Sequence, residues 1–364
     1  SGGSGASTGA TGASSTGTAG SPASSAAATS SAAASTSTSP SVTGAPHPAI
    51  AATLATGLNV PWGLAFLPDG SALVGSRDTF VIHRITTSGA VTAVGTVPHV
   101  VSNVDEAGEA GLLGLALHPS YPAEPWLYAY HSTASDNRIV RMRYREGRLG
   151  TPRPVLTGIA MSVHHNGGGL AFGPDGHLYV GTGDAEDTTT PQDTDSLNGK
   201  ILRITETGAV PSGNPFDNEV WTYGHRNVEG LAFDGDTLWA SEFGDKAYDE
   251  LNRIVKGGDY GWPDVEGSDG SGGYRDPFAQ WHTSACSPSG IAIADGRAWL
   301  GALQGECVWS VDLTTAAKRR YLTGHGRIRM VRAAPDGSLW VGTSNTDGRS
   351  TASSGDDRIF RVTL

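Results

Sequence analysis

Charged side chains and long apolar runs are both scarce in this sequence, and each scarcity argues against a class of protein. Charged residues make up 17% of the 364 positions, and acidic residues outnumber basic ones, which gives a formal net charge of -11. An acidic chain repels the phosphates of nucleic acid, so no nucleic-acid partner is expected. No run of about 18 apolar residues occurs, so no transmembrane segment is expected either.

Cysteine is almost absent. The two cysteines, Cys286 and Cys307, are too few for a disulfide framework or a cysteine-rich metal site. If bridged, they would close a loop of about 20 residues and contribute roughly 3 kcal/mol to stability. Two buried free thiols fit the sequence equally well, and the sequence leaves both states open.

The beginning of the chain lacks charge altogether. Residues 1–40 contain only Ser, Gly, Ala, Thr and Pro, and the first charged side chain is Asp69. Such a segment cannot bury enough apolar area to offset its ordering entropy, so we expect a disordered tail over residues 1–48 and a folded domain over residues 49–364. Tails of this composition resemble the spacers that follow an exported or lipid-anchored N-terminus. We therefore expect an extracytoplasmic protein, whether secreted, periplasmic or lipid-anchored at the cell surface.

Glycine, by contrast, is abundant, and a pattern that contains it recurs six times. Each copy has an apolar segment with a small residue in it, a few turn residues, and a second apolar segment. The copies are GLAFLPDGSALVGS from Gly63, GLALHPSYPAEPWLYAY from Gly114, GLAFGPDGHLYVGTGD from Gly169, GLAFDGDTLWASEFG from Gly230, GIAIADGRAWLGALQG from Gly290 and VRAAPDGSLWVGTSN from Val331. The starts lie 41 to 61 residues apart, which is room for four short strands each.

The repeat predicts an all-β fold. Further apolar strands follow several copies, among them FVIHRIT from Phe80 and RIFRVTL from Arg358, and no long helical periodicity lies between copies. Six four-stranded sheets around one axis make a six-bladed β-propeller of about 315 residues. Closing that ring requires residues near Ile50 to Leu58 to pair with the last blade. The alternative is an ordinary β-sandwich in which similar turns recur by coincidence.

Polar residues with useful chemistry lie at the ends of the predicted inner strands, where the loops of a propeller gather. They are His164, His165, Asp184, Arg226, Asn227, the stretch 242–249, Gln304, Arg327 and Arg329. Arg327 and Arg329 are two apart, so on a strand they would face the same way and form a double cationic clamp for carboxylates. Arg226 and Asn227 can share a ligand if GHRN lies in a loop, which Gly224 makes plausible.

Five stretches together resemble those of a known family. They are GLLGLALHPSY, HHNGGGLAFGPDGHLYVGTGDA, LNGKILRI, GHRNVEGLAF and DELNRIVKGGDYGWPDVEG. They resemble the soluble quinoprotein glucose and aldose sugar dehydrogenases of the glucose/sorbosone dehydrogenase family, which use pyrroloquinoline quinone (PQQ) and calcium on a six-bladed propeller. The resemblance extends from Pro61 to Leu364. It implies oxidation of aldose sugars at the anomeric carbon to lactones, with electrons passed to an external acceptor.

The resemblance also implies roles for four polar residues. His165 falls at the place of the catalytic base that takes the proton of the anomeric hydroxyl. Asp184 falls where an acidic residue orients this histidine and stabilises its cationic form. Arg226 and Asn227 match the residues that contact the quinone oxygens, where hydrogen-bond donors stabilise the charge that develops on reduction.

Two calcium sites are implied in the same way. The backbone carbonyls of Gly244 and Asp245 match the segment that coordinates the active-site ion together with PQQ. Glu250 and the Tyr260 carbonyl match a second, structural site that would hold the loop KGGDYGWP. Calcium prefers oxygen ligands, so loops rich in carbonyl groups suit it.

The pattern of the cofactor pocket departs from the family at several positions. Arg327 and Arg329 match the clamp on the carboxylates of PQQ. Gln304, however, stands where relatives usually carry a basic residue, Glu109 replaces an amide, and His164 stands where some relatives have Asp. Losing a charged hydrogen bond costs of the order of 1–3 kcal/mol, so these departures predict weaker PQQ binding unless the two arginines suffice.

Two other functions compete with a sugar dehydrogenase. One is a binding-only propeller, as in the hedgehog-interacting proteins, which resemble this family. The other is a calcium-dependent hydrolase or lactonase, which would want several carboxylates converging on the channel in place of paired arginines. The preferred sugar depends on loops such as 185–195 and 267–276, whose sequences do not identify it. Nothing suggests an obligate apolar interface, so a monomer is expected.

Overall fold

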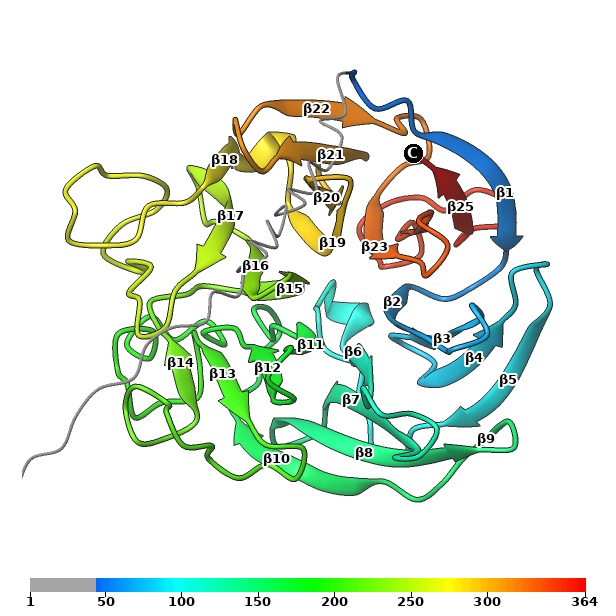
Figure 1. Ribbon diagram of the computed structural model, residues 1–364, viewed down its shortest axis with the longest axis horizontal. Helices are drawn as coiled ribbons and strands as arrows, with labels where there is room; N and C mark the ends of the chain where they lie inside the picture. The colour runs from blue at the N-terminus through cyan, green and yellow to red at the C-terminus, as the bar shows by residue number, and fades with distance from the viewer. Residues whose placement is uncertain (1–43) are drawn as a thin grey trace, which may run out of the picture. The chain divides into compact units, whose positions relative to one another are not determined.

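The computed structural model describes residues 44–364, and the strands in that range form six antiparallel sheets arranged in a ring (Figure 1). The six-bladed β-propeller predicted from the repeat is therefore confirmed. Most of the tail predicted over residues 1–48 lies outside the described residues. No helix in the described range has the length and apolar character needed to cross a bilayer.

Each sheet follows the chain from the axis outward, as the repeat predicts. The first three sheets are β2 (Pro61–Phe66), β3 (Ala72–Ser76), β4 (Val81–Ile85) and β5 (Val91–Thr96); β6 (Leu112–Leu117), β7 (Trp126–Ser132), β8 (Asn137–Arg145) and β10 (Arg153–Ile159), with β9 (Arg148–Leu149) paired to β8; and β11 (Leu170–Phe172), β12 (Leu178–Gly181), β13 (Ile201–Ile204) and β14 (Val220–Thr222).

The other three sheets repeat this order. They are β15 (Val228–Asp234), β16 (Thr237–Glu242), β17 (Tyr248–Ile254) and β18 (Ala279–His282); β19 (Pro288–Ala294), β20 (Arg297–Ala302), β21 (Cys307–Asp312) and β22 (Lys318–Tyr321); and β23 (Ile328–Ala333), β24 (Leu339–Thr343), β25 (Ile359–Thr363) and β1 (Ala49–Ala55). Two short 3₁₀ turns, η1 (Val104–Glu106) and η2 (Thr283–Ala285), lie in the loops.

The last sheet joins the two ends of the propeller. Strand β1 pairs antiparallel with β25, with Ile50 opposite Val362 and Thr53 opposite Phe360 (Figure 1). This confirms the pairing expected for residues near Ile50 to Leu58. The ladder hydrogen bonds therefore tie the start of the domain to its end and close the ring, with β1 as the outermost strand of the last sheet.

The hydrophobic core lies between adjacent sheets. Trp340 of β24 is buried and packs edge-to-face on Phe66 of β2, with ring centroids 5.2 Å apart, so the sixth and first sheets share one cluster. Cys286 and Cys307 are buried in the cluster of the fifth sheet, and both are free thiols. The sequence left their state open, and the structure shows no bridge between them.

The inner strands approach one another closely because glycine begins the repeat in five of its six copies. A Cβ atom at Gly114 would collide with the carbonyl oxygen of Gly168, just before the next inner strand. A Cβ atom at Gly290 would come within 2.6 Å of the Arg329 carbonyl oxygen. Glycine is therefore required for close approach of backbone to backbone around the axis.

The close approach at Gly114 predicts a large cost for one added methyl group. We expect Gly114→Ala to lower the free energy of unfolding by about 1–3 kcal/mol, because the inner strands must move apart to admit it. Urea unfolding followed by tryptophan fluorescence measures the loss. The control is Gly273→Ala, whose Cβ would meet at closest only the flexible Ser271 hydroxyl, at 3.3 Å. Equal stabilities of the two variants would contradict the packing described here.

Candidate functional site

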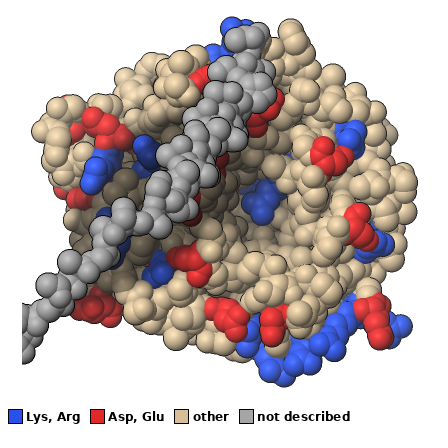
Figure 2. All heavy atoms as spheres, in the orientation of Figure 1, with Lys and Arg blue, Asp and Glu red and all other residues tan. Residues whose placement is uncertain are grey.

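A cavity of about 290 Å³ lies where the loops of the six blades meet at one end of the channel. Figure 2 shows a hollow near the centre of the face turned to the viewer, with basic side chains inside it. The residues predicted from the sequence that line the cavity are Glu109, His164, His165, Arg226, Asn227, Gly244, Asp245, Gln304, Arg327 and Arg329. The structure therefore brings together residues that are more than two hundred positions apart in the chain.

His165 and Asp184 form a hydrogen-bonded pair at the cavity wall. The Nδ1 atom of His165 lies 2.7 Å from Oδ1 of Asp184, whose side chain is buried. The indole N–H of Trp262 donates to the other oxygen, Oδ2, at 2.8 Å. An ionised carboxylate at Nδ1 keeps the proton on that nitrogen, so Nε2 is the basic atom of the ring.

The backbone of His165 is held in an uncommon conformation. Its φ angle is 58°, in the left-handed region, and its N–H donates to Oε2 of Glu109 at 2.7 Å. The N–H of Gly167 donates to Oδ1 of Asn227 at 2.9 Å. Glu109 and Asn227 thus fix the loop that carries the imidazole, and the amide nitrogen of Asn227 is the group left for a ligand.

Arg226 lies in a loop between β14 and β15, as the glycine before it suggested. Gly224 has a φ of 73°, and the Arg226 N–H donates to Oε1 of Glu242 at 2.6 Å. The guanidinium lies 5.5 Å from the centre of the Trp262 ring and 3.4 Å from Asp245. Its Nε is buried without a hydrogen-bond partner in the described chain, which marks an unused donor beside the cavity.

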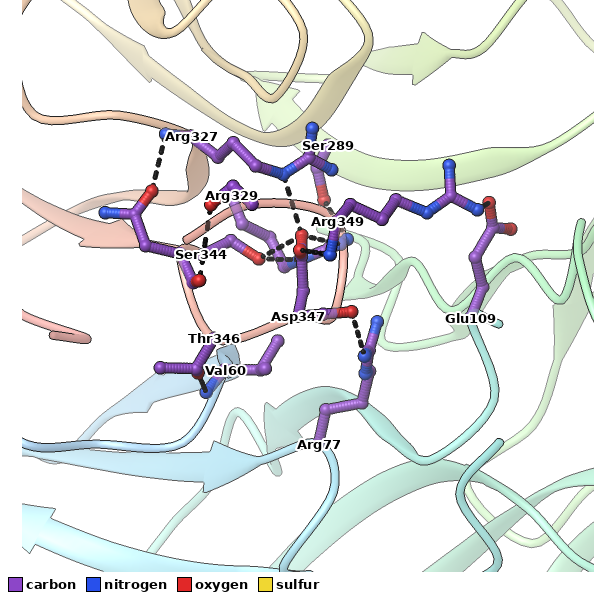
Figure 3. Close-up of polar contacts among 12 residues, drawn as sticks. Val60, Arg77, Glu109, Ser289, Arg327, Arg329, Ser344, Thr346, Asp347 and Arg349 are labelled. Atoms are coloured by element: carbon purple, nitrogen blue, oxygen red, sulfur yellow. Dashed lines mark hydrogen bonds and ion pairs between the residues drawn. The ribbon is translucent and has the colours of Figure 1, made fainter. Parts of the chain in front are cut away.

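Arg327 and Arg329 lie together at the start of β23, but carboxylates already contact both (Figure 3). Nε of Arg327 donates to Asp347 at 2.9 Å, and a nitrogen of Arg329 lies 3.9 Å from the same Asp347 oxygen. Arg329 also donates to Glu229 at 2.8 Å. Burial opposes ionisation of Asp347, but the two arginines outweigh it and hold the pKa of that carboxyl below its usual range.

Two further carboxyl groups face the cavity in an environment that disfavours their charge. Burial raises the pKa of Glu229 to about 7, although Arg329 beside it favours the ionised form. Burial raises the pKa of Asp249 to about 6, although the N–H groups of Ser287 and Gly244 donate to it. The arginines of the cavity are always charged, so its balance near neutral pH is on the positive side.

The loop after β16 is held by the carboxylate of Glu266. Oε1 of Glu266 accepts hydrogen bonds from four consecutive N–H groups, those of residues 245–248. In a trans peptide the carbonyl points away from the N–H that follows it, so the carbonyls of Gly244 and Asp245 point away from Glu266. Both residues line the cavity.

Glu250 and Tyr260 lie outside the main cavity, beside a separate gap of about 10 Å³ that Glu242 and Glu266 also line. Burial and then the nearby Glu242 carboxylate raise the pKa of Glu250 to about 8. Among residues 44–364, no group of three or more His, Cys, Asp or Glu side chains is arranged to hold a metal ion. A cation at either place would therefore depend on backbone carbonyls.

Several residues of the cavity escaped the sequence analysis. They are Arg77, Glu229, Asp347 and Arg349. Arg77 directly follows the second strand of the first repeat, and Asp184 follows the second strand of the third repeat. A search for polar residues at strand ends, which found Asp184, could therefore also have found Arg77. Arg349 lies 3.5 Å from Glu109, a contact between the sixth and second blades that no local pattern encodes (Figure 3).

Comparisons with known proteins identify the family of this chain. A profile of the family described as glucose / sorbosone dehydrogenase matches residues 58–352. The solved PQQ-bound aldose sugar dehydrogenase from Streptomyces coelicolor is 49% identical, with a TM-score of 0.83 over 87% of this chain and 98% of its own. The aldose sugar dehydrogenase YliI of Escherichia coli is 29% identical over 85% of this chain and 94% of its own length. Quinoprotein glucose dehydrogenase B of Acinetobacter calcoaceticus is 33% identical over 66% of this chain and 58% of its own.

These likenesses define an oxidoreductase of the sugar dehydrogenase class. The fold and the histidine and carboxylate pair fit this class. The chain belongs to the glucose/sorbosone dehydrogenase family.

The raised pKa of Glu229 predicts a specific pH dependence of stability. The folded chain keeps the Glu229 proton up to a pKa of about 7, whereas the ordinary value is 4.5. Between these values the folded state binds more protons than the unfolded state, so this carboxyl lowers stability as the pH rises. Glu229→Gln cannot titrate. Urea unfolding of the protein without added ligand measures the effect. Relative to this variant, the free energy of unfolding of the wild type should fall by about 1–3 kcal/mol between about pH 5 and pH 7.5.

The control for this experiment is Glu146→Gln, which alters an exposed glutamate outside the cavity. Its stability difference from wild type should stay constant over the same pH range. A constant difference for Glu229→Gln as well would contradict a raised pKa at Glu229.

Proposed function

We propose that the protein oxidises aldose sugars at the anomeric carbon to lactones, with PQQ in the 290 Å³ cavity, Ca²⁺ beside it and an external acceptor for the electrons. The observation that carries this proposal is the His165–Asp184 pair, 2.7 Å apart, in the wall of a cavity that arginines line. A base and its orienting carboxylate supply proton transfer, and the cations suit an anionic redox group.

The residues of the cavity fit a tri-anionic cofactor. Arg327 and Arg329 lie side by side at its floor, and Arg77 and Arg349 also line it, although Asp78 pairs with Arg77 at 2.8 Å and Glu109 lies 3.5 Å from Arg349. Arg226 has an unused buried Nε donor. Guanidinium groups bind carboxylates in a bidentate way, and the arginines present enough of them for a tricarboxylate.

Glu109, the other departure from the family pattern, does not add a free negative charge to the cavity. Its two oxygens are engaged by the His165 N–H at 2.7 Å and by Arg349 at 3.5 Å. We infer that this carboxylate holds the loop of the catalytic histidine. The neutral form of Glu229 also reduces repulsion of an anion, because its pKa of about 7 keeps part of the population protonated near neutral pH.

The chain's own residues account for the proton in this reaction. When bound, PQQ supplies the two-electron acceptor for the hydride of the anomeric carbon. Nε2 of His165 removes the proton of the anomeric hydroxyl, and Asp184 stabilises the imidazolium that results. Trp262 donates to Asp184 at 2.8 Å and so keeps the carboxylate in place for this role.

We assign Ca²⁺ to the loop after β16. The carbonyls of Gly244 and Asp245 would hold one ion beside PQQ, since oxygen-rich lining suits calcium. A second ion near Glu250 and the Tyr260 carbonyl would relieve the repulsion between the Glu250 and Glu242 carboxyl groups, which contributes to the Glu250 pKa of about 8. The composition of residues 1–40 supports an extracytoplasmic location, and we expect a monomer.

The proposal predicts that His165 is essential for turnover. In protein reconstituted with PQQ and Ca²⁺, we expect His165→Ala to lower kcat for dye reduction by glucose by about 10²–10⁴-fold, because the variant lacks the base proposed to take the proton of the anomeric hydroxyl. The matched control is His47→Ala, which removes an exposed histidine outside the cavity. Dye reduction that survives at the wild-type rate in His165→Ala would remove the imidazole from the mechanism. Release of acid from a lactone without dye turnover would indicate a hydrolase instead.

Cofactor affinity tests the role of the arginines separately from catalysis. We expect Arg327→Met to weaken PQQ binding by about 10–100-fold, the loss of one charged hydrogen bond. Titration of the protein with PQQ, followed by tryptophan quenching, measures this affinity without turnover. Arg148→Met, at an exposed position outside the cavity, serves as the control. Equal affinities of the two variants would place the PQQ carboxylates elsewhere.

A further inference from the structure

A second cavity lies at the opposite end of the channel from the first. Its volume is about 340 Å³, and it is lined by Ala65, Phe66, Ala116, Leu117, Ala171, Phe172, Leu231, Ala232, Phe233, Ile291, Ala292, Ile293, Arg332 and Ala333. The site residues precede the inner strands, whereas these residues lie toward the far ends of the same strands. Arg332 is three residues beyond Arg329 on β23, which is about 10 Å along a strand.

The channel between the two cavities is narrow. A gap of about 30 Å³ separates them, lined by the repeat glycines Gly63, Gly114, Gly169, Gly230 and Gly290 together with neighbouring residues of the inner strands. Because these glycines allow close backbone packing, a molecule in one cavity has no route through the waist to the other. The second cavity is therefore a separate site.

The lining of this cavity is asymmetric, because the sixth copy of the repeat differs from the other five at two positions. Five copies carry alanine at one position, namely Ala65, Ala116, Ala171, Ala232 and Ala292, and the sixth carries Arg332. The next position holds a large apolar residue in the same five copies, namely Phe66, Leu117, Phe172, Phe233 and Ile293, and the sixth carries Ala333. The sixth blade thus exchanges one methyl group for a guanidinium and one bulky side chain for a small one, which introduces a cation and leaves room beside it.

The Arg332 guanidinium differs from those of the proposed catalytic cavity. Arg327 and Arg329, on the same strand, each contact a carboxylate. Arg332 is only partly buried, and no hydrogen bond or ion pair with a group within residues 44–364 engages its guanidinium. The guanidinium is therefore free to pair with an anion, and the apolar side chains around it would strengthen that pairing by excluding water.

We propose that this second cavity binds an apolar monocarboxylate, with its carboxylate on Arg332 and its hydrocarbon body against Phe66, Phe172 and Phe233. The lining offers one charged side chain and a ring of apolar ones, which matches a ligand with one anionic end. Its volume is within the ordinary range of sites for small ligands. A sugar does not suit this lining, because its several hydroxyl groups would find too few hydrogen-bond partners. The inference does not rest on the proposed dehydrogenase activity.

Calorimetric titration of the full chain with sodium octanoate tests the proposal. Wild-type protein should bind one octanoate per chain, and octanol, which has the same body without the charge, should bind at least tenfold more weakly. Arg332→Ala restores the residue that the other five repeats carry, so it should fold. It should bind octanoate at least tenfold more weakly than wild type and should no longer distinguish octanoate from octanol.

A second variant tests whether binding needs the room beside Arg332, and it leaves the charge unchanged. Ala333→Phe restores the bulky residue of the other repeats and keeps the guanidinium, and it should lose octanoate binding at least tenfold because the ring fills the cavity. Arg319→Ala, at an exposed position outside the cavity, should bind as wild type does. PQQ titration should give the same affinity in Arg332→Ala as in wild type, since the two cavities are separate.

Three results would overturn the proposal. The first is octanoate binding of equal affinity in wild type and Arg332→Ala. The second is equal affinity of wild type for octanoate and octanol, which would show that the cation contributes nothing. The third is no binding heat with octanoate at millimolar concentration in a protein whose urea unfolding is normal.

Discussion

The close approach of the inner strands around the axis is the constraint on which the rest of the molecule depends. Glycines at the start of five repeats let the backbone of one blade lie against that of the next, as at Gly114 and the Gly168 carbonyl. This packing narrows the channel to a waist with a cavity at each end. It also aligns the strand ends of all six blades, so that loops from distant parts of the chain meet over the same mouth.

Electrostatics then shapes the cavity that the loops enclose. Five arginines and five carboxyl groups line it, but the two sets do not balance near neutral pH. Arginine stays charged, whereas burial raises the pKa of Glu229 to about 7 and that of Asp249 to about 6. Asp347 remains ionised between Arg327 and Arg329 and holds them in place. The result is a preformed cationic floor next to a histidine, which suits an anionic redox group.

The sequence predicted the architecture well because its signal is repetitive and local. Six copies of one hairpin pattern indicated six blades. Their strand ends predicted His165, Arg226 and Arg327 as site residues, and these three line one cavity. The contacts between blades were not predictable in the same way. Arg77 donates to the Asp347 carbonyl across 270 positions, and this contact depends on how two loops fold over the channel.

The carboxylate partners of the two-arginine clamp could not be predicted from the sequence either. Spacing alone indicated that Arg327 and Arg329 face the same way, but it gave no sign of the carboxylates that contact them. Glu109 in place of an amide similarly predicted weaker PQQ binding, whereas the structure shows that Glu109 accepts a hydrogen bond from the His165 N–H. Glu229 and Glu109 come from other blades and Asp347 comes from a later loop of the same blade, and a local pattern cannot show which groups a side chain will meet.

The most direct test of the central claim follows the absorbance of PQQ bound to the protein with Ca²⁺ and without any dye. We expect one PQQ molecule to bind per chain, and we expect an added aldose to convert its spectrum from the oxidised to the reduced form in a single turnover. The proposed oxidation of aldoses would be contradicted if the protein binds no PQQ. It would also be contradicted if the spectrum of bound PQQ stays oxidised after aldoses are added.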